Sequence, residues 1–266
     1  MSRYFVSERD QPRMRRAADA VMVVTGLVLL LWTTVNADRI LALEEALLAL
    51  ATSVPSWFEQ AYRLVYFAGL LIVVALVIAV IAQGRRRLDL LRDIVLALVA
   101  TLGLALLLAW WIDGELPMAF PEFSSAAVEP HFPVMRGALL TSAIAVSAPH
   151  LTRPLRRTGW TLVVLATIAA FGLGFGMPSD AVGGVGLGLV IAGTILLIFG
   201  SPRGYPDVAS ITEALAELGL VVDNLTVTPD QSWGTRRLSG VLDDRREVEV
   251  KAYGRDATDS QLMSKA

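Results

Sequence analysis

Long runs of apolar residues with almost no charge fill most of the first 200 residues of this chain, and they limit its fold more than any other feature. A helix needs about twenty such residues to cross the hydrocarbon core of a bilayer. The runs predict an all-α membrane domain with six transmembrane helices. They lie near residues 17–35, 62–83, 88–112, 133–149 (a short one), 159–177 and 180–200.

The first run has two interpretations. Arginines precede it and the letters "VNA" at 35–37 resemble a cleavage site, as in a secretory signal peptide. However, the run exceeds the roughly 7–15 apolar residues of a signal peptide. A retained membrane anchor is therefore the favoured interpretation.

Residues 37–60 carry apolar residues at helical spacing up to a Pro-Ser-Trp break. This pattern predicts an amphipathic helix in the plane of the membrane interface. Trp57 and Phe58 are the expected interface anchors, because aromatic side chains favour the headgroup level.

Basic residues alternate with acidic ones from loop to loop. Arginines precede the first run and occur at 85–87 and 153–157, whereas the other loops are rich in Asp and Glu. Cytoplasmic loops carry the excess of Lys and Arg, so both termini are predicted to be cytoplasmic and the loop before Arg136 to face outward. Residues 1–16 are then a basic cytoplasmic N-terminus and 17–200 the membrane domain.

Residues 201–266 differ in character. A Pro/Gly linker leads to Asp207, which is placed to cap a helix running to about Gly219. Alternating apolar and polar residues then predict three strands near 220–228, 235–242 and 246–254. This pattern indicates a small cytoplasmic α+β segment. The chain stops within a polar stretch, which predicts that it is the N-terminal part of something longer.

Composition excludes several chemistries. The chain has no cysteine, two histidines and a formal net charge of -2. Disulfides, thiolate zinc sites and cysteine nucleophiles are therefore excluded, and a histidine-rich metal site is not expected. No nucleic-acid partner, metal or cofactor is predicted. The expected partners are membrane lipids, another membrane protein or the rest of a longer chain.

Two outward-facing stretches carry a family resemblance: "FPVMRGALLTSA" at 132–143 and "GLGFGMPSDAVGGVGLGLV" at 172–190. Together they resemble the type-2 phosphatidic acid phosphatase superfamily, six-helix membrane enzymes that hydrolyse lipid phosphates. In that family Phe-Pro-Ser-Gly-His opens the fourth helix, and Ser-Arg-x5-His-x3-Asp joins the fifth helix to the sixth. The resemblance covers about residues 17–200.

The catalytic residues that the resemblance implies are mostly replaced. The histidine of the fourth helix falls on Arg136, the nucleophilic histidine on Gly176, and the Ser-Arg pair on Ala169 and Ala170; only Asp180 is kept. The family's first motif should lie near 106–117, where there is no lysine or arginine. A phosphoester site must neutralise developing negative charge, and one arginine among several carboxylates does not. The chain therefore resembles a phosphatase scaffold without the phosphatase chemistry.

Each remaining residue has a structural interpretation beside the functional one. Arg136 either extends to the interface, pairs with Asp180 or Glu129, or holds a lipid phosphate or a partner. Asp180 has the position of an acidic N-cap, and the glycines of 172–193 predict close helix packing. Trp110 and Trp111 are predicted interface-belt residues.

The C-terminal segment carries a second resemblance. "REVEVKAYG" at 246–254 is similar to the third strand of a protein-kinase-like N-lobe, which places Lys251 at the nucleotide-binding lysine. No glycine-rich loop of the kinase pattern precedes it. An exposed strand lysine is the other interpretation.

The combination resembles the front of larger bacterial membrane proteins that continue into a flippase-like region, similar to the transmembrane part of lysylphosphatidylglycerol synthases. It favours a non-catalytic plasma-membrane module that binds lipid or a partner, with Arg136 and Asp180 as lipid- or anion-binding residues. Two alternatives stay open: an active lipid-phosphate or prenyl-pyrophosphate phosphatase, and a transporter or flippase component.

Overall fold

In the computed structural model, residues 13–36, 44–47, 49, 56–113, 133–202, 208–229, 235–242 and 246–253 are described. The described chain divides into two compact units, residues 15–200 and a second unit that contains residues 201–266 with the N-terminal residues 1–14.

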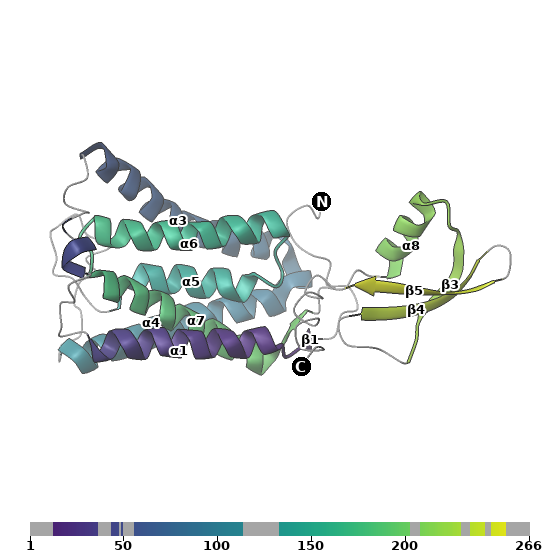
Figure 1. Ribbon diagram of the computed structural model, residues 1–266, viewed down its shortest axis with the longest axis horizontal. Helices are drawn as coiled ribbons and strands as arrows, with labels where there is room; N and C mark the ends of the chain where they lie inside the picture. Colours follow the sequence, from purple (N-terminus) through teal and green to yellow (C-terminus); the bar gives the residue numbers. More distant parts are fainter. Residues whose placement is uncertain are drawn as a thin grey trace. The chain divides into compact units, whose positions relative to one another are not determined.

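The larger unit is all-α and contains a helix at each of the six predicted apolar runs (Figure 1). These helices are α1 (Ala17–Val35), α3 (Ser56–Ala82), α4 (Leu88–Asp113), α5 (Met135–Ser147), α6 (Arg153–Gly172) and α7 (Pro178–Phe199). A short 3-10 helix, Gly84–Arg87, joins α3 to α4.

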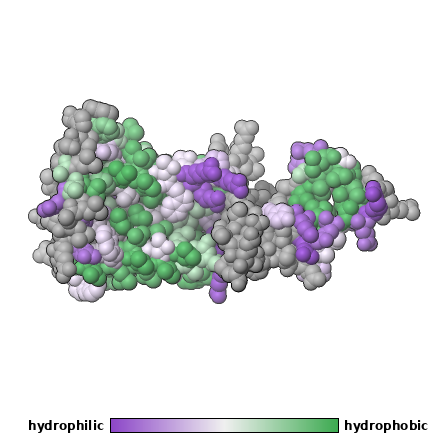
Figure 2. Space-filling view, in the orientation of Figure 1, coloured by the Kyte–Doolittle hydropathy of each residue, from purple (hydrophilic) through white to green (hydrophobic). Residues whose placement is uncertain are grey.

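Four of these helices, α1, α3, α4 and α7, are long and apolar enough to cross a membrane. Their exposed sides carry large apolar side chains, which cover much of the face of this unit in Figure 2. Such surfaces on a multi-helix unit identify a membrane protein, since water-facing helices carry polar residues there. Of the six predicted spans, these four have the length and composition of a membrane-crossing helix.

The other two helices depart from a simple span. α5 has 13 residues and is therefore about 20 Å long, which is shorter than the roughly 30 Å hydrocarbon core. α6 starts at Arg153, six residues earlier than predicted, because its basic first turns are helical too. α3 likewise begins at Ser56 instead of Tyr62, so Phe58 belongs to the helix.

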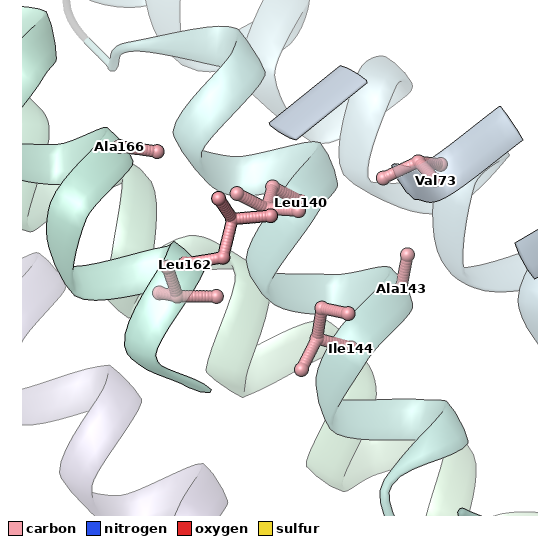
Figure 3. Packing of buried hydrophobic residues seen from close by; sticks show 7 residues of the cluster. Val73, Leu140, Ala143, Ile144, Leu162 and Ala166 are labelled. Atoms are coloured by element: carbon pink, nitrogen blue, oxygen red, sulfur yellow. The ribbon is translucent and has the colours of Figure 1, made fainter. Parts of the chain in front are cut away.

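α5 is the central helix of the unit. Eleven of its 13 residues are buried. Leu140, Ala143 and Ile144 pack against Leu162 and Ala166 of α6 and Val73 of α3 (Figure 3). Its polar and small residues therefore face other helices. Because it is surrounded by protein, this helix does not need the length of a membrane span.

α7 packs closely against two helices through glycines, as predicted. A Cβ on Gly186 would lie 3.0 Å from the carbonyl oxygen of Gly26 in α1, and one on Gly193 would lie 2.9 Å from that of Asp19. Residues later in α7 thus contact residues earlier in α1, so these two helices are antiparallel. The start of α1 and the end of α7 lie at the same end of the unit.

That end holds two ion pairs with fully buried carboxylates. Asp19 accepts from Arg16 at 3.1 Å, and Asp93 of α4 accepts from Arg92 at 2.9 Å. The Arg92 guanidinium also lies 4.2 Å from the ring centre of Phe199 at the end of α7.

The smaller unit confirms the predicted α+β pattern. Helix α8 (Val208–Glu217) precedes an antiparallel sheet in the order β3-β4-β5, formed by Val222–Val227, Thr235–Leu242 and Glu247–Tyr253. Ile211 of α8 packs with Leu238 and Ala252 on one face of this sheet. A short pairing that the sequence did not predict joins β1 (Arg13–Met14) to β2 (Ser201–Pro202).

Part of the predicted interfacial helix lies outside the described residues. Residues 44–47 are helical as expected, while 37–43, 48, 50–55 and the side chain of Trp57 are not described. Asp207 and the loop that contains His131, Glu115 and Glu129 are also outside the described part.

Candidate functional site

The start of α5 and the start of α7 lie side by side at the end of the unit opposite the Arg16–Asp19 pair. The backbone N–H of Val134 donates to the backbone oxygen of Asp180 at 3.3 Å. A Cβ on Gly184, six residues after the first residue of α7, would lie 2.5 Å from the Val134 carbonyl oxygen. This close approach brings Arg136 and Asp180, 44 positions apart in the sequence, to the same end of the fold.

Asp180 binds the first turn of its own helix. Its Oδ2 accepts from the backbone N–H of Met177 at 2.7 Å, and the residue is 9% exposed. Asp180 is thus the third residue of α7 and Met177 is the N-cap, which corrects the predicted N-cap assignment. The proline at the first helical position moves the boundary, because it cannot donate a hydrogen bond and favours that place.

Glu44 is a second carboxylate at this helix start, and sequence reasoning missed it. Its Oε1 accepts from the backbone N–H of Ser179 at 3.1 Å, and Glu44 is 4% exposed. A helix N-terminus attracts negative charge through its unpaired N–H groups, so both carboxylates stabilise α7. Glu44 stands next to Glu45 in an amphipathic pattern, and nothing local indicates which of the two is buried.

Arg136 lies against aromatic rings of α3. Its guanidinium carbon is 4.9 Å from the ring centre of Tyr66 and 5.1 Å from that of Phe67. Tyr66 in turn stacks on Phe175, with 5.0 Å between ring centres. The side chain is 7% exposed, so the cation lies inside the fold over ring faces that attract positive charge.

Arg136 also borders a cavity of about 290 Å³ between four helices. Among the lining residues it is the one charged side chain, and the walls are otherwise aliphatic apart from Tyr66. The lining consists of Tyr66, Gly69, Leu70 and Val73 from α3; Leu98, Val99 and Leu102 from α4; Arg136, Gly137, Leu139 and Leu140 from α5; and Ala166 from α6.

The positions that would carry phosphatase chemistry are filled by packing. A Cβ on Gly176 would lie 2.9 Å from Cγ2 of Val134 and 3.2 Å from Cβ of Asp180. Ala169 and Ala170 are buried on α6 in a cluster with Tyr66 and Val134. These places hold core contacts where the resemblance would put a nucleophile and a phosphate-binding arginine.

The other singled-out residues have packing, turn or surface positions. His150 is 1% exposed and follows the far end of α5. Trp110 and Trp111 are exposed near the end of α4, as expected of belt residues. Of the predicted packing glycines, Gly172 contacts the Tyr62 ring, whereas Gly174 has open space and a φ of +73°, so it serves a turn instead.

Lys251 lies in the smaller unit. It is exposed on β5, directly across the strand pair from Arg237 of β4. Arg237 also lies 3.5 Å from Glu249, so this face of the sheet carries charges of both signs. Within the described part of the chain, no group of three His, Asp or Glu residues could hold a metal ion.

No family model and no curated protein matches this sequence. Among solved structures, a match exists with the crystal structure of the first transmembrane PAP2 type phosphatidylglycerolphosphate phosphatase from Bacillus subtilis. The two chains are 19% identical, the match covers 64% of this chain and 94% of that chain, and the TM-score is 0.49. A likeness at that level does not establish a shared family.

Proposed function

We propose that this chain is a non-catalytic, multi-pass membrane protein that binds an anionic membrane lipid at the end where α5 and α7 begin. Arg136 would contact the headgroup, while Asp180 and Glu44 hold the start of α7 in place beside it. The observation that carries the proposal is the buried guanidinium of Arg136 at the edge of an apolar cavity. Charged side chains within membrane segments face the interior of a helix bundle or a cavity and often mark a binding site.

The packing around Gly176 supports binding without hydrolysis. Hydrolysis through a covalent phosphoenzyme needs a nucleophile with space to reach the phosphorus atom. Val134 and Asp180 occupy the space into which a side chain at position 176 would extend. Arginine at position 136 can hold an anion, but it cannot shuttle protons near neutral pH.

The proposal also includes the orientation and the wider context. Both termini would be cytoplasmic in a bacterial plasma membrane, and the Arg136 end would face outward. The smaller unit would be the start of a kinase-like lobe with Lys251 as its nucleotide-binding lysine, at the front of a longer lipid-handling protein. The three consecutive antiparallel strands β3, β4 and β5 are compatible with this assignment.

The test compares lipid binding with phosphate release. The full chain is purified in mild detergent, and the phospholipid that remains bound is quantified by phosphorus assay and mass spectrometry. We expect Arg136→Gln to lose most of the bound anionic lipid. Arg63→Gln removes an equal charge from an exposed position on α3 and should keep it.

Phosphatidic acid and a prenyl pyrophosphate are then supplied as substrates. No phosphate release above background is expected. Release that disappears in Asp180→Ala would show that the chain is a phosphatase with displaced catalytic residues. Equal lipid retention in both arginine variants would contradict lipid binding through Arg136.

A further inference from the structure

Helix α6 carries a continuous stripe of exposed residues, and the character of this stripe changes along the helix. It begins with Arg153 and Arg157, passes Thr161 and continues with Val164 and Ile168, all of them exposed. Residues three or four positions apart lie on the same face of a helix, so these five share one face. The buried residues of α6 lie on its other side and pack in the unit.

The apolar part of the stripe suits the hydrocarbon of a membrane. Val164 is 57% exposed, Leu165 beside it is 44% exposed and Ile168 is 39% exposed. Arg157 precedes Val164 by seven residues, which is about 10 Å along the helix axis. Long arginine side chains can extend over such a distance to the headgroup level of the same leaflet. Figure 2 shows a hydrophilic patch over the start of α6, beside the apolar surface of this unit.

The start of α6 lies at the end of the membrane unit opposite Arg136. A Cβ on Gly159, in the second turn of α6, would lie 3.0 Å from Cγ2 of Ile144, near the end of α5. Arg136 is the second residue of α5. The arginines of the α6 stripe therefore belong to the other leaflet.

The acidic residues described at this end of the unit face other arginines. Asp19 lies 3.1 Å from Arg16, while Asp89 and Asp93 lie 3.9 Å and 2.9 Å from Arg92. In the described part of the chain, no carboxylate forms an ion pair with the two arginines of the α6 stripe. The stripe therefore presents uncompensated positive charge, which matches a surface of anionic headgroups.

We propose that Arg153 and Arg157 bind the phosphate of an anionic phospholipid in the leaflet at the start of α6, while the apolar residues beyond Thr161 contact its acyl chains. A guanidinium suits this role because it can donate two parallel N–H groups to phosphate oxygens. This lipid surface is separate from Arg136 and does not depend on lipid binding there.

The test measures which lipid lies beside the stripe. The chain has no cysteine, so one introduced cysteine can carry a fluorophore at a chosen place. Thr161→Cys puts the label one turn after Arg157. The labelled full chain is reconstituted in phosphatidylcholine nanodiscs that contain equal small fractions of nitroxide-labelled phosphatidylglycerol or nitroxide-labelled phosphatidylcholine. We expect at least about fivefold more effective quenching by phosphatidylglycerol, because one basic residue near an anionic surface has roughly this effect on binding.

Substitutions then assign the preference to the two arginines. Arg153→Gln combined with Arg157→Gln should abolish it, whereas Arg157→Lys alone keeps the charge and should retain most of it. Arg63→Gln is the matched control, because Arg63 is an exposed arginine of α3 that pairs with Glu59 at 2.7 Å. Its quenching ratio should equal that of the labelled wild-type chain.

Two outcomes would overturn this inference. Equal quenching by the two lipids without arginine substitutions would mean that these arginines serve another occupant, such as an acidic protein segment. A preference that survives the double substitution would mean that the stripe does not hold the lipid. If the double variant unfolds at a lower temperature, Arg157→Gln alone must still reduce the preference. Arg136→Gln should leave the ratio unchanged, so this inference and the proposed function can fail separately.

Discussion

The side chains around the start of α7 explain why this helix can begin inside a membrane protein. Helix starts leave backbone N–H groups without intrahelical acceptors, and burying such groups is costly without partners. Asp180 accepts from Met177 and Glu44 accepts from Ser179, so two of these donors are satisfied by carboxylates. The charges at this end therefore have a structural role even without a ligand.

Removing the Asp180 carboxylate should weaken the fold measurably. Asp180→Ala is expected to lower the free energy of unfolding by about 1 kcal/mol, the usual effect of losing a helix-start acceptor. Asp180→Asn keeps an oxygen acceptor and should lose less. Thermal unfolding in detergent measures both, and an unchanged midpoint for Asp180→Ala would show that the hydrogen bond to Met177 contributes nothing.

Placing a histidine at position 176 should not create a phosphatase. The Cβ of Gly176→His would lie 2.9 Å from Cγ2 of Val134, so the side chain forces the starts of α5 and α7 apart. Overpacking of this kind costs about 1–3 kcal/mol. We expect a lower unfolding midpoint and no phosphate release from phosphatidic acid. Gly176→Ala should share much of the destabilisation, since the clash begins at Cβ.

Helix α7 shows at the scale of an element what glycines do in a membrane fold. Gly186 and Gly193 face α1, while Gly184 and Gly188 face the start and middle of α5. Lipid provides little hydrophobic driving force for helix association. Close backbone approach and van der Waals packing stabilise the association instead. Glycine on both sides lets α7 pack tightly between α1 and the central helix.

Alanine substitutions distinguish packing from helix propensity. Gly188→Ala places a Cβ 2.6 Å from the carbonyl oxygen of Ala138, and backbone atoms must move. We expect its unfolding temperature to fall. Gly103→Ala, with open space around it, should raise stability by up to about 1 kcal/mol, because alanine is the better helix former. A rise for both substitutions would contradict close packing between α7 and α5.

At the scale of the whole molecule, the antiparallel α1 and α7 bring the start and the end of the membrane unit to one side. We propose from the positive-inside rule that this side faces the cytoplasm. α5 is too short to span a membrane by itself, and neighbouring helices cover it. α6 starts with arginines whose side chains can extend to the interface.

Reporter fusions test this topology. A reporter inserted at Arg86 should show cytoplasmic location, and one inserted at Glu122 should show the opposite side. The expectation follows from the arginines at 85–87 and the acidic loop around 122. The same side for both positions would mean that α4 does not span, and the outward assignment of Arg136 would fail with it.

Much of the architecture could be predicted from local patterns. Apolar runs predicted the positions of all six helices, and alternation predicted β3, β4 and β5. Boundaries were less accurate where a helix extends into polar residues, as at Arg153 of α6 and Ser56 of α3. Hydropathy detects the apolar part of a helix. The helix itself can continue into polar residues beyond that part.

The sequence by itself determined that the chain is a membrane protein with a small α+β segment, because lipid solubility and strand alternation are local properties of residues in order. It also singled out Arg136 as a charged residue at the start of an apolar run, where it would meet hydrocarbon. Only the tertiary structure decided that Glu44 holds the start of α7, that Val134 fills the space beside Gly176, and that Arg136 borders an apolar cavity. These facts depend on contacts between helices far apart in the chain, and no local pattern carries the identity of a distant neighbour.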